Sequence, residues 1–290
     1  MIPWFAKAGN RRLSISFLTL ALLMTAFHSC MTFRMSDKEV DAYFKKYNVD
    51  GSRLAHKWQG KRMHYVVAGN PKGKLVVFVH GSPGSLSAFI HFLRDSTLTS
   101  EALVISADRP GFGHSAFGVG EPSIEQQANS LKPILERYKD NGPAILVGHS
   151  LGGPVIAKMA IDFPDLVGGL VLVAASIDPE LEPNERWWRV PLATPFLKWV
   201  LPRSMRASND EIVGLKWELE QMIPEWAKIQ CPVIVVQGEK DKLVPSRNAE
   251  FAKKMIVNAP VELMIKADMN HFVPWTNPGV IHEAVMKLIK

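Results

Sequence analysis

The chain has 290 residues, 47% of them hydrophobic and 21% charged, with a formal net charge of +6. This composition is typical of a globular protein and excludes a disordered one. The length allows either one α/β domain with an insertion or two domains. The sequence contains no block of basic residues interleaved with aromatic ones, which argues against nucleic-acid binding.

The N-terminus has the pattern of a secretory signal. Lys7, Arg11 and Arg12 precede an apolar run over residues 13–27, and a basic start followed by a short apolar core is typical of such signals. The run is shorter than the roughly 20 residues that a membrane-spanning helix needs. Residues 1–29 are therefore predicted to be a signal peptide.

The end of this segment, Phe27-His28-Ser29-Cys30, resembles the lipobox of bacterial lipoproteins, although Phe27 and His28 depart from the usual pattern. The resemblance implies that Cys30 is lipidated and that the protein is anchored in the bacterial cell envelope, facing the periplasm or the exterior. An uncleaved signal anchor and an ordinary cleaved signal are the alternatives. The one other cysteine, Cys231, stands at the head of an apolar strand and is expected to be a buried, inert thiol.

After this segment, Ser36 and Glu39 form a capping box, which predicts a helix to about Tyr47. Residues 31–59 are expected to hold this helix and a linker, standing between the anchor and a domain over residues 60–290. No cysteine or histidine grouping has the spacing of a zinc site, and no other metal or cofactor is expected.

Short apolar runs alternate with longer helical patterns in the rest of the chain. This alternation predicts a mostly parallel, doubly wound sheet with helices on both faces. The expected strands are 64–68, 75–79, 102–107, 143–147, 170–173, 233–236 and 261–265, and the expected helices are 123–139, 155–162 and 278–290.

The alternation is interrupted over residues 178–228. This stretch is rich in proline and holds Trp187, Trp188, Trp199, Trp217 and Trp226. We expect it to form a small helical lid, inserted between two strands above the carboxyl ends of the sheet, where ligands bind in such folds. The alternative is a surface excursion whose tryptophans pack on the main domain.

The central motif is Gly148-His149-Ser150-Leu151-Gly152, which follows an apolar strand and precedes a helix. A G-x-S-x-G motif in that context predicts a nucleophile elbow, a tight turn that exposes the serine hydroxyl. Side chains at Gly148 and Gly152 would collide with the neighbouring strand or helix. Taken by itself, the motif could equally be a plain turn without chemistry.

A serine nucleophile needs a base and an acid that orients the base. His271, in a loop between the last strand and the final helix, is the preferred base; His282 also lies late in the chain but within a helix. Asp241, in the loop after strand 233–236, is the preferred acid, with Asp178 and Glu239 as alternatives.

The reaction also needs two donors for the developing oxyanion. One is expected to be the backbone N–H of Leu151, directly after the nucleophile. The other is expected from the His80-Gly-Ser-Pro-Gly84 loop, where Ser82 has an N–H and Pro83 has none.

These motifs stand in the order found in the α/β-hydrolase fold family: His80 to Gly84, Asp108 to Ser115, Gly148 to Gly152, Gly238 to Asp241, and His271. The chain most resembles the serine-esterase and meta-cleavage-hydrolase branch. The resemblance implies an α/β-hydrolase fold with Ser150 as nucleophile, Asp241 as acid, His271 as base, and Ser82 and Leu151 as oxyanion donors. It also implies that Asp108 and Arg109 brace loops beside the site.

The expected activity is hydrolysis of an ester of an apolar small molecule or lipid-like substrate through an acyl-enzyme. Carbon–carbon bond hydrolysis or lactone opening on the same triad is an alternative, because a fold does not fix its substrate. A ligand-binding homologue that has lost turnover is a third. The sequence does not indicate an oligomeric state.

Overall fold

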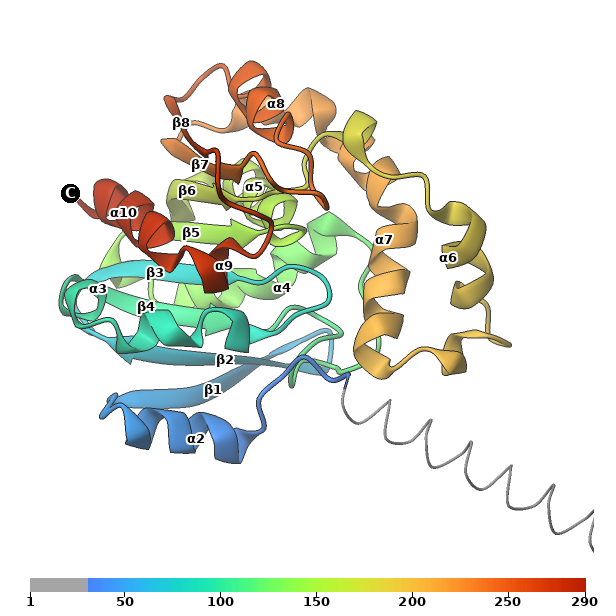
Figure 1. Ribbon diagram of the computed structural model, residues 1–290. Helices are drawn as coiled ribbons and strands as arrows, with labels where there is room; N and C mark the ends of the chain where they lie inside the picture. The colour runs from blue at the N-terminus through green and yellow to red at the C-terminus, as the bar shows by residue number, and fades with distance from the viewer. Residues whose placement is uncertain (1–30) are drawn as a thin grey trace, which may run out of the picture.

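The computed structural model describes residues 31–290, so the predicted signal peptide and Cys30 lie outside the described residues. The described part forms one eight-stranded sheet with the order β1-β2-β4-β3-β5-β6-β7-β8 (Figure 1). Strands β1 and β2 pair antiparallel, β2 is antiparallel to β4, and the pairs from β4 to β8 are parallel. The strands are β1 (Gly51–Trp58), β2 (Lys61–Gly69), β3 (Lys74–Val79), β4 (Ala102–Ala107), β5 (Ala144–His149), β6 (Val167–Val173), β7 (Val233–Gly238) and β8 (Val261–Lys266).

The central strands are buried along their whole length, as continuous apolar runs predict for a sheet covered on both faces. Strand β1 was not expected, and it occupies the place of the linker in residues 31–59. Its side chains alternate between half-buried and exposed, because it lies at the edge of the sheet. An edge strand can keep polar residues such as Arg53 and Lys57, so its sequence lacks the apolar run that marked the other strands.

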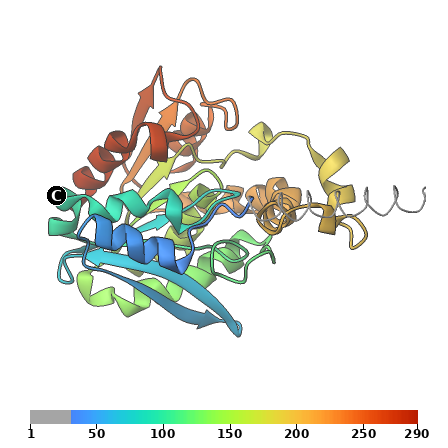
Figure 2. The same cartoon turned by 60° about the horizontal axis from the view of Figure 1, so that its bottom comes forward.

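Helices cover both faces of the sheet (Figure 2). Helices α4 (Ile124–Arg137), α5 (Gly152–Asp162) and α8 (Asn248–Met255) pack into one core cluster, and α2 (Asp37–Lys46), α3 (Ser96–Glu101) and α10 (Pro278–Ile289) pack into the other. A short helix, α9 (Val273–Thr276), precedes α10. The shorter 3-10 helices outside the insertion are η1 (Leu86–Ala88), η2 (Ile90–Arg94), η3 (Lys139–Asn141) and η4 (Pro164–Leu166).

The capping box at the start of α2 is present as predicted. Ser36 Oγ accepts a hydrogen bond from the Glu39 N–H, and the Glu39 carboxylate accepts one from the Ser36 N–H. Val40 and Phe44 are buried in the core cluster beneath the sheet. The helix therefore packs into the core of the domain instead of spacing the domain from an anchor.

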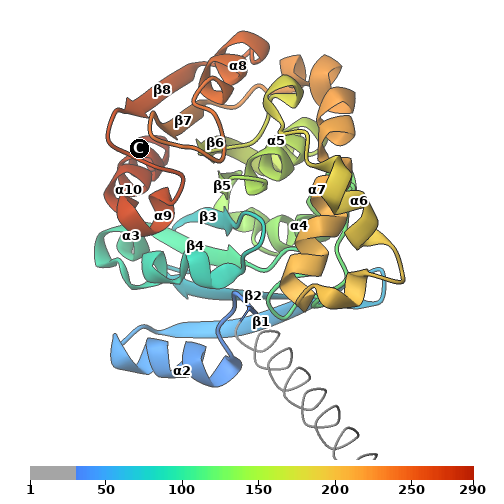
Figure 3. The same cartoon turned by 45° about the vertical axis from the view of Figure 1, so that its right-hand side comes forward.

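The stretch between β6 and β7 is helical. It contains η5 (Pro179–Leu181), α6 (Arg186–Ala193), η6 (Lys198–Val200), α7 (Arg203–Met222) and η7 (Ile223–Lys228). Figure 3 shows α7 standing beside the sheet with α6 outside it. Leu215, Leu219 and Met222 of α7 pack into the same core cluster as α4 and α5, while α6 buries none of its residues.

Within residues 31–290, no helix is both long enough and apolar enough to cross a membrane.

Candidate active site

Ser150 lies in the turn between β5 and α5. Its φ of 53° falls in the left-handed region that non-glycine residues rarely adopt, and such backbone strain is common at functional sites. Its own N–H donates to the Val173 carbonyl, 3.0 Å away, which fixes the turn to the neighbouring strand.

The glycines on either side leave no room for side chains, as the motif predicted. A Cβ at Gly148 would lie 2.4 Å from the Gly152 carbonyl oxygen, and one at Gly152 would lie 2.4 Å from the Val79 carbonyl oxygen. Both contacts are with backbone, which cannot move away without disturbing β3 or α5. The elbow is therefore held between the central strands and its own helix.

His271 and Asp241 meet at the carboxyl end of the sheet. His271 Nδ1 lies 2.8 Å from Asp241 Oδ2, and the Asp241 side chain is fully buried. An ionised carboxylate can only accept, so this contact assigns the proton of neutral His271 to Nδ1 and leaves Nε2 as the basic nitrogen.

Asp241 is held in its ionised form. Burial raises the pKa of Asp241, but hydrogen bonds from His271 and from the N–H groups of Val244 and Leu243 outweigh burial and lower that pKa below its ordinary value. The two N–H contacts are 2.8 and 2.9 Å long, both to Oδ1. The carboxylate is thus fixed in orientation and stays charged opposite His271.

The alternative acids and base lie elsewhere. Asp178 accepts from the Glu180 N–H at the start of η5, and Glu239 is exposed. His282 pairs with Asp95, its Nδ1 lying 2.6 Å from Asp95 Oδ2. The structure therefore pairs His271 with Asp241 and places His271 with Ser150 in the lining of one cavity, and none of the three alternatives has such a place.

His149, next to the serine, packs against His271 with ring centroids 4.8 Å apart. Its Nε2 lies 2.8 Å from the His271 carbonyl oxygen and must carry a proton to donate there. Burial, together with the nearby His271, lowers the pKa of His149 from 6.5 to about 3. His149 is therefore neutral, and its hydrogen bond to the His271 carbonyl holds the loop that carries His271.

Two backbone N–H groups beside Ser150 are available to an incoming oxygen. Among the described residues, neither the Leu151 N–H nor the Ser82 N–H has an acceptor, whereas the Ser150 N–H is committed to Val173. Leu151 directly precedes α5, so its N–H lies at the positive end of the helix dipole. The Ser82 side chain is fixed separately, by donating to Ser208 Oγ of α7 over 2.9 Å.

Ser150, His271 and Ser82 line one cavity of about 590 Å³. Its remaining wall is largely apolar, with Met31, Phe33, Met205, Leu243, Phe272 and Trp275. Phe33, Leu243, Phe272 and Trp275 are each at least 42% exposed. The cavity therefore combines a polar floor at the serine with an apolar mouth, as ligand pockets commonly do.

A buried ion pair connects the Ser82 loop to helix α7. Arg109 donates to the carbonyl oxygens of His80 (2.8 Å) and Gly81 (2.9 Å), and its Nη1 and Nη2 donate to the two carboxylate oxygens of Glu211, at 2.7 and 3.1 Å. Both side chains are at most 1% exposed. Gln127 donates to Glu211 Oε2 at 3.1 Å and accepts from Arg109. The expectation that Arg109 braces loops beside the site is confirmed by these contacts.

His80 adds to this bracing. Its Nε2 accepts from the Arg109 N–H at 3.0 Å, which leaves Nδ1 to donate to the Gly81 carbonyl at 2.7 Å. Complete burial and the adjacent Arg109 charge hold the pKa of His80 well below its ordinary value. The ring is therefore neutral and fixed in one tautomer.

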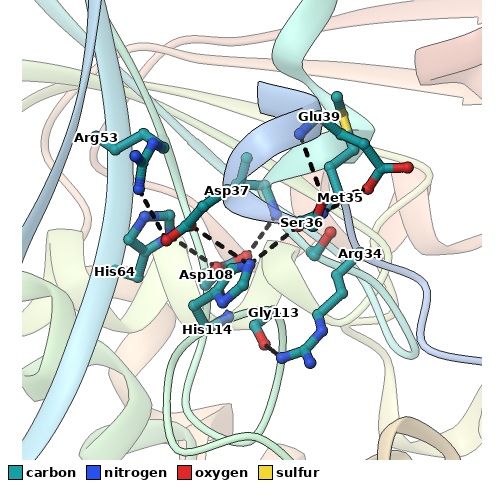
Figure 4. Close-up of polar contacts among 12 residues, drawn as sticks. Arg34, Met35, Ser36, Asp37, Glu39, Arg53, His64, Asp108, Gly113 and His114 are labelled. Carbon is teal, nitrogen blue, oxygen red and sulfur yellow. Dashed lines mark hydrogen bonds and ion pairs between the residues drawn. The ribbon is translucent and has the colours of Figure 1, made fainter. Parts of the chain in front are cut away.

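The neighbouring Asp108 braces a second set of loops (Figure 4). It accepts from the N–H groups of Leu86 and His114, at 2.7 and 2.9 Å, and lies 3.2 Å from His64 Nδ1. His114 Nε2 in turn lies 3.0 Å from the Met35 carbonyl oxygen. Arg34 donates to the Gly113 carbonyl. These contacts fasten the start of the described chain to the loop after β4.

Sequence reasoning missed Glu211, Met31 and Phe33. Glu211 had a signal: it lies three and four residues from Ser208 and Leu215 on the buried stripe of α7, where an acidic residue needs a partner. Met31 and Phe33 had none, because only the folded chain brings them to the cavity.

The fold and this site together define an α/β protein in which a serine elbow lines the same cavity as a histidine that is hydrogen-bonded to an aspartate. An α/β-hydrolase-fold family model matches residues 74–197. Over 80% of this chain and 67% of the relative, the sequence is 30% identical to the dihydrolipoyllysine-residue acetyltransferase component of the acetoin cleaving system of Pseudomonas putida. Over 73% of this chain and 75% of the relative, it is 27% identical to Lipase 1 of Psychrobacter immobilis.

The fold is similar to that of a putative aryl esterase from Burkholderia cenocepacia, with a TM-score of 0.64, 20% identity, and 82% of this chain and 98% of that one covered. The chain belongs to the α/β-hydrolase fold family, as its motifs predicted. The family model and the similarity to Lipase 1 support hydrolase activity. The alignments span 56%, 67% and 75% of the length of three curated relatives.

Proposed function

We propose that this hydrolase cleaves carboxylic esters of apolar or lipid-like molecules through an acyl-enzyme on Ser150. The observation that carries the proposal is that Ser150, in its positive-φ turn, lines the same cavity as His271, which is hydrogen-bonded to the buried Asp241. The apolar mouth of that cavity supports an apolar substrate.

In the proposed reaction, His271 Nε2 takes the Ser150 hydroxyl proton as the oxygen attacks the ester carbonyl. The N–H groups of Ser82 and Leu151 stabilise the oxyanion. The C–O bond to the alcohol then breaks, and His271 delivers the proton to the leaving oxygen. Water, deprotonated by His271, attacks the acyl carbon, and the proton returns to Ser150 as the acid is released.

The test is a panel of p-nitrophenyl esters of increasing acyl length, measured on the wild type and on Ser150→Ala. We expect kcat to fall by about 10⁴–10⁶-fold in the variant, because nucleophile and base act as a unit. Ser100→Ala, at an exposed serine outside the cavity, is the control.

Fluorophosphonate labelling followed by peptide mapping identifies the nucleophile directly. Ser82, Ser85 and Ser87 line the same cavity, so a label on any of these in place of Ser150 contradicts the proposal. Tight ligand binding with an unlabelled Ser150 would point to a non-catalytic homologue. Turnover of a vinylogous diketone or a lactone, without turnover of simple esters, would point to the other triad chemistries.

We further infer that the N-terminal thirty residues direct the chain to the bacterial cell envelope and hold it at a membrane. The basic start, the apolar run over residues 13–27 and Cys30 support this inference. Palmitate labelling that is lost in Cys30→Ala would establish lipidation. An unprocessed N-terminus starting at Met1 would contradict it and leave a signal anchor.

A further inference from the structure

The insertion presents large apolar side chains to solvent over residues 186–203, here called the ridge. Trp187 is 80% exposed, Phe196 84% and Trp199 55%, with Val190 and Leu197 also exposed. Trp187 and Val190 are three residues apart on α6 and so share a face. Single exposed apolar residues are common on protein surfaces, but a group of this kind within one short stretch marks an interaction site.

The indole N–H of Trp199 is already hydrogen-bonded within the ridge. Trp199 donates its indole N–H to the Phe196 carbonyl, 2.6 Å away within the same turn. Its polar group therefore needs no water, and the ring can leave water without an unsatisfied donor. Helix α6 lies outside α7 and buries none of its residues, so nothing in the described part of the chain covers the ridge (Figure 1).

Basic residues outnumber acidic ones in the stretch that forms the ridge. Between Arg186 and Asn209 the sequence has no acidic residue, and it has five basic ones: Arg186, Arg189, Lys198, Arg203 and Arg206. Glu185 pairs with Arg189. Arg186 and Arg206 hydrogen-bond only to backbone carbonyls, and Asp210 lies close enough to Lys198 and Arg206 to attract both charges. Exposed tryptophans among lysines and arginines are the composition of surfaces that lie in the interface of an anionic membrane.

The first described residues lie beside the start of α7, directly after the ridge. Ser204, at the start of α7, donates its hydroxyl proton to the Met31 carbonyl oxygen. The thirty residues before Met31 include the apolar run over residues 13–27. Figures 1 and 3 show the first described residues, in blue, approaching the lower end of α7. Any surface that holds the apolar run therefore lies within reach of the ridge.

We propose that the ridge docks on a lipid bilayer that contains anionic lipids, with Trp187, Phe196 and Trp199 among the head groups. A second copy of the chain is a poorer occupant. A two-fold contact would bring the ridge against itself, with its excess of basic residues face to face. The inference does not depend on the catalytic proposal, and its test has no activity readout.

The test is hydroxyl-radical footprinting of the full chain, in which exposed aromatic side chains are oxidised. The chain is mixed with vesicles of phosphatidylcholine alone or of phosphatidylcholine with phosphatidylglycerol. We expect oxidation of Trp187, Phe196 and Trp199 to fall several-fold in the anionic vesicles, and the protection to weaken in high salt. Tyr47, 39% exposed and outside the ridge, should keep its reactivity, and buried Trp226 should stay unreactive if the fold is intact.

A double variant that removes one aromatic ring and reverses one charge tests whether the ridge residues bind the vesicles. Phe196→Ser combined with Lys198→Glu should abolish the protection of Trp187, whereas Val257→Ser, at a residue 67% exposed outside the ridge, should leave it unchanged. Repeating the experiment in Ser150→Ala separates the docking from catalysis.

Equal oxidation of the three rings with either vesicle and in buffer would overturn the proposal. Protection that appears without vesicles and rises with protein concentration would also overturn it, in favour of contact between copies.

Discussion

At the scale of single residues, the three residues of the proposed triad come from loops that each follow a strand of the parallel sheet. The motif around Ser150 could be recognised because its two glycines cannot be replaced. A Cβ at Gly148 or Gly152 would lie 2.4 Å from a backbone oxygen. From the sequence, only its position in the loop favoured Asp241 over Glu239 as the acid that orients His271. The hydrogen bond to His271 supplies the physical reason, since Glu239 is exposed and Asp241 is not.

Asp241→Asn tests the role of the carboxylate. The Asn amide can donate to His271 Nδ1 and so stabilise the tautomer that carries its proton on Nε2, where the base must be free. We expect kcat to fall by about 10⁴-fold with KM little changed. Steady-state kinetics on a p-nitrophenyl ester measures both, and Glu239→Gln should retain wild-type rates. A loss of less than tenfold would show that His271 does not need Asp241.

His149 makes the stability of the protein depend on pH. Its pKa is about 3 in the folded protein against an ordinary 6.5, so the unfolded chain binds its proton first as the pH falls. The stabilisation is complete above pH 6.5 and is lost between 6.5 and about 3, at up to about 1.4 kcal/mol per pH unit.

In His149→Gln we expect the free energy of unfolding to fall less steeply over this pH range. Urea unfolding between these pH values measures the slope, and His80 remains in the variant as a second buried neutral histidine. Parallel curves for wild type and variant would contradict this assignment.

At the scale of elements, strands with continuous apolar sequence were predictable and those without were not. Strands β3 and β4 are buried on both faces, so their composition alone identifies them. Edge strand β1 faces solvent on one side and depends on pairing with β2 along its full length. The connection of α7 to the Ser82 loop through Arg109 and Glu211 was also beyond prediction, because it depends on tertiary contact between segments 102 residues apart.

Glu211→Gln tests that connection. It leaves the Arg109 charge buried without its counter-ion, which we expect to cost about 3–5 kcal/mol of unfolding free energy. Because Arg109 also holds the His80 and Gly81 carbonyls, kcat should fall with it. Glu136→Gln, which breaks an exposed pair with Lys132, should cost no more than about 0.5 kcal/mol. Urea unfolding of both variants gives the comparison, and equal costs would show that the buried pair is dispensable.

At the scale of the whole molecule, residues 31–59 were predicted to hold a helix and a linker outside the domain. The helix is present, but it packs into the core, and residues before it line the cavity. Phe44 of α2 is 5% exposed and packs in the core cluster with β3 and α10. Met31 and Phe33 reach the cavity that contains Ser150. The sequence could identify the cap of the helix from local contacts, but its docking depends on surfaces supplied by distant parts of the chain.

Phe44→Ala tests whether α2 is integral to the fold. Removing a buried phenylalanine ring is expected to cost about 3–5 kcal/mol. Tyr47→Ala, at a residue 39% exposed in the same helix end, should cost much less. Thermal or urea unfolding measures both. A cost below about 1 kcal/mol for Phe44→Ala would mean that the helix contributes little beyond spacing.

Met31 lines the cavity that contains Ser150, and this limits the distance between Ser150 and a membrane in which the N-terminal segment is anchored. One residue spans at most about 3.6 Å, so a chain attached at Cys30 would have almost no slack before Met31 meets the cavity wall. In the proposed anchored state, substrate dissolved in the bilayer would reach Ser150 by lateral diffusion, a search in two dimensions. Substrate dissolved in water would gain nothing from the attachment. The same enzyme would then discriminate between esters by the phase in which they are dissolved, before any contact within the cavity.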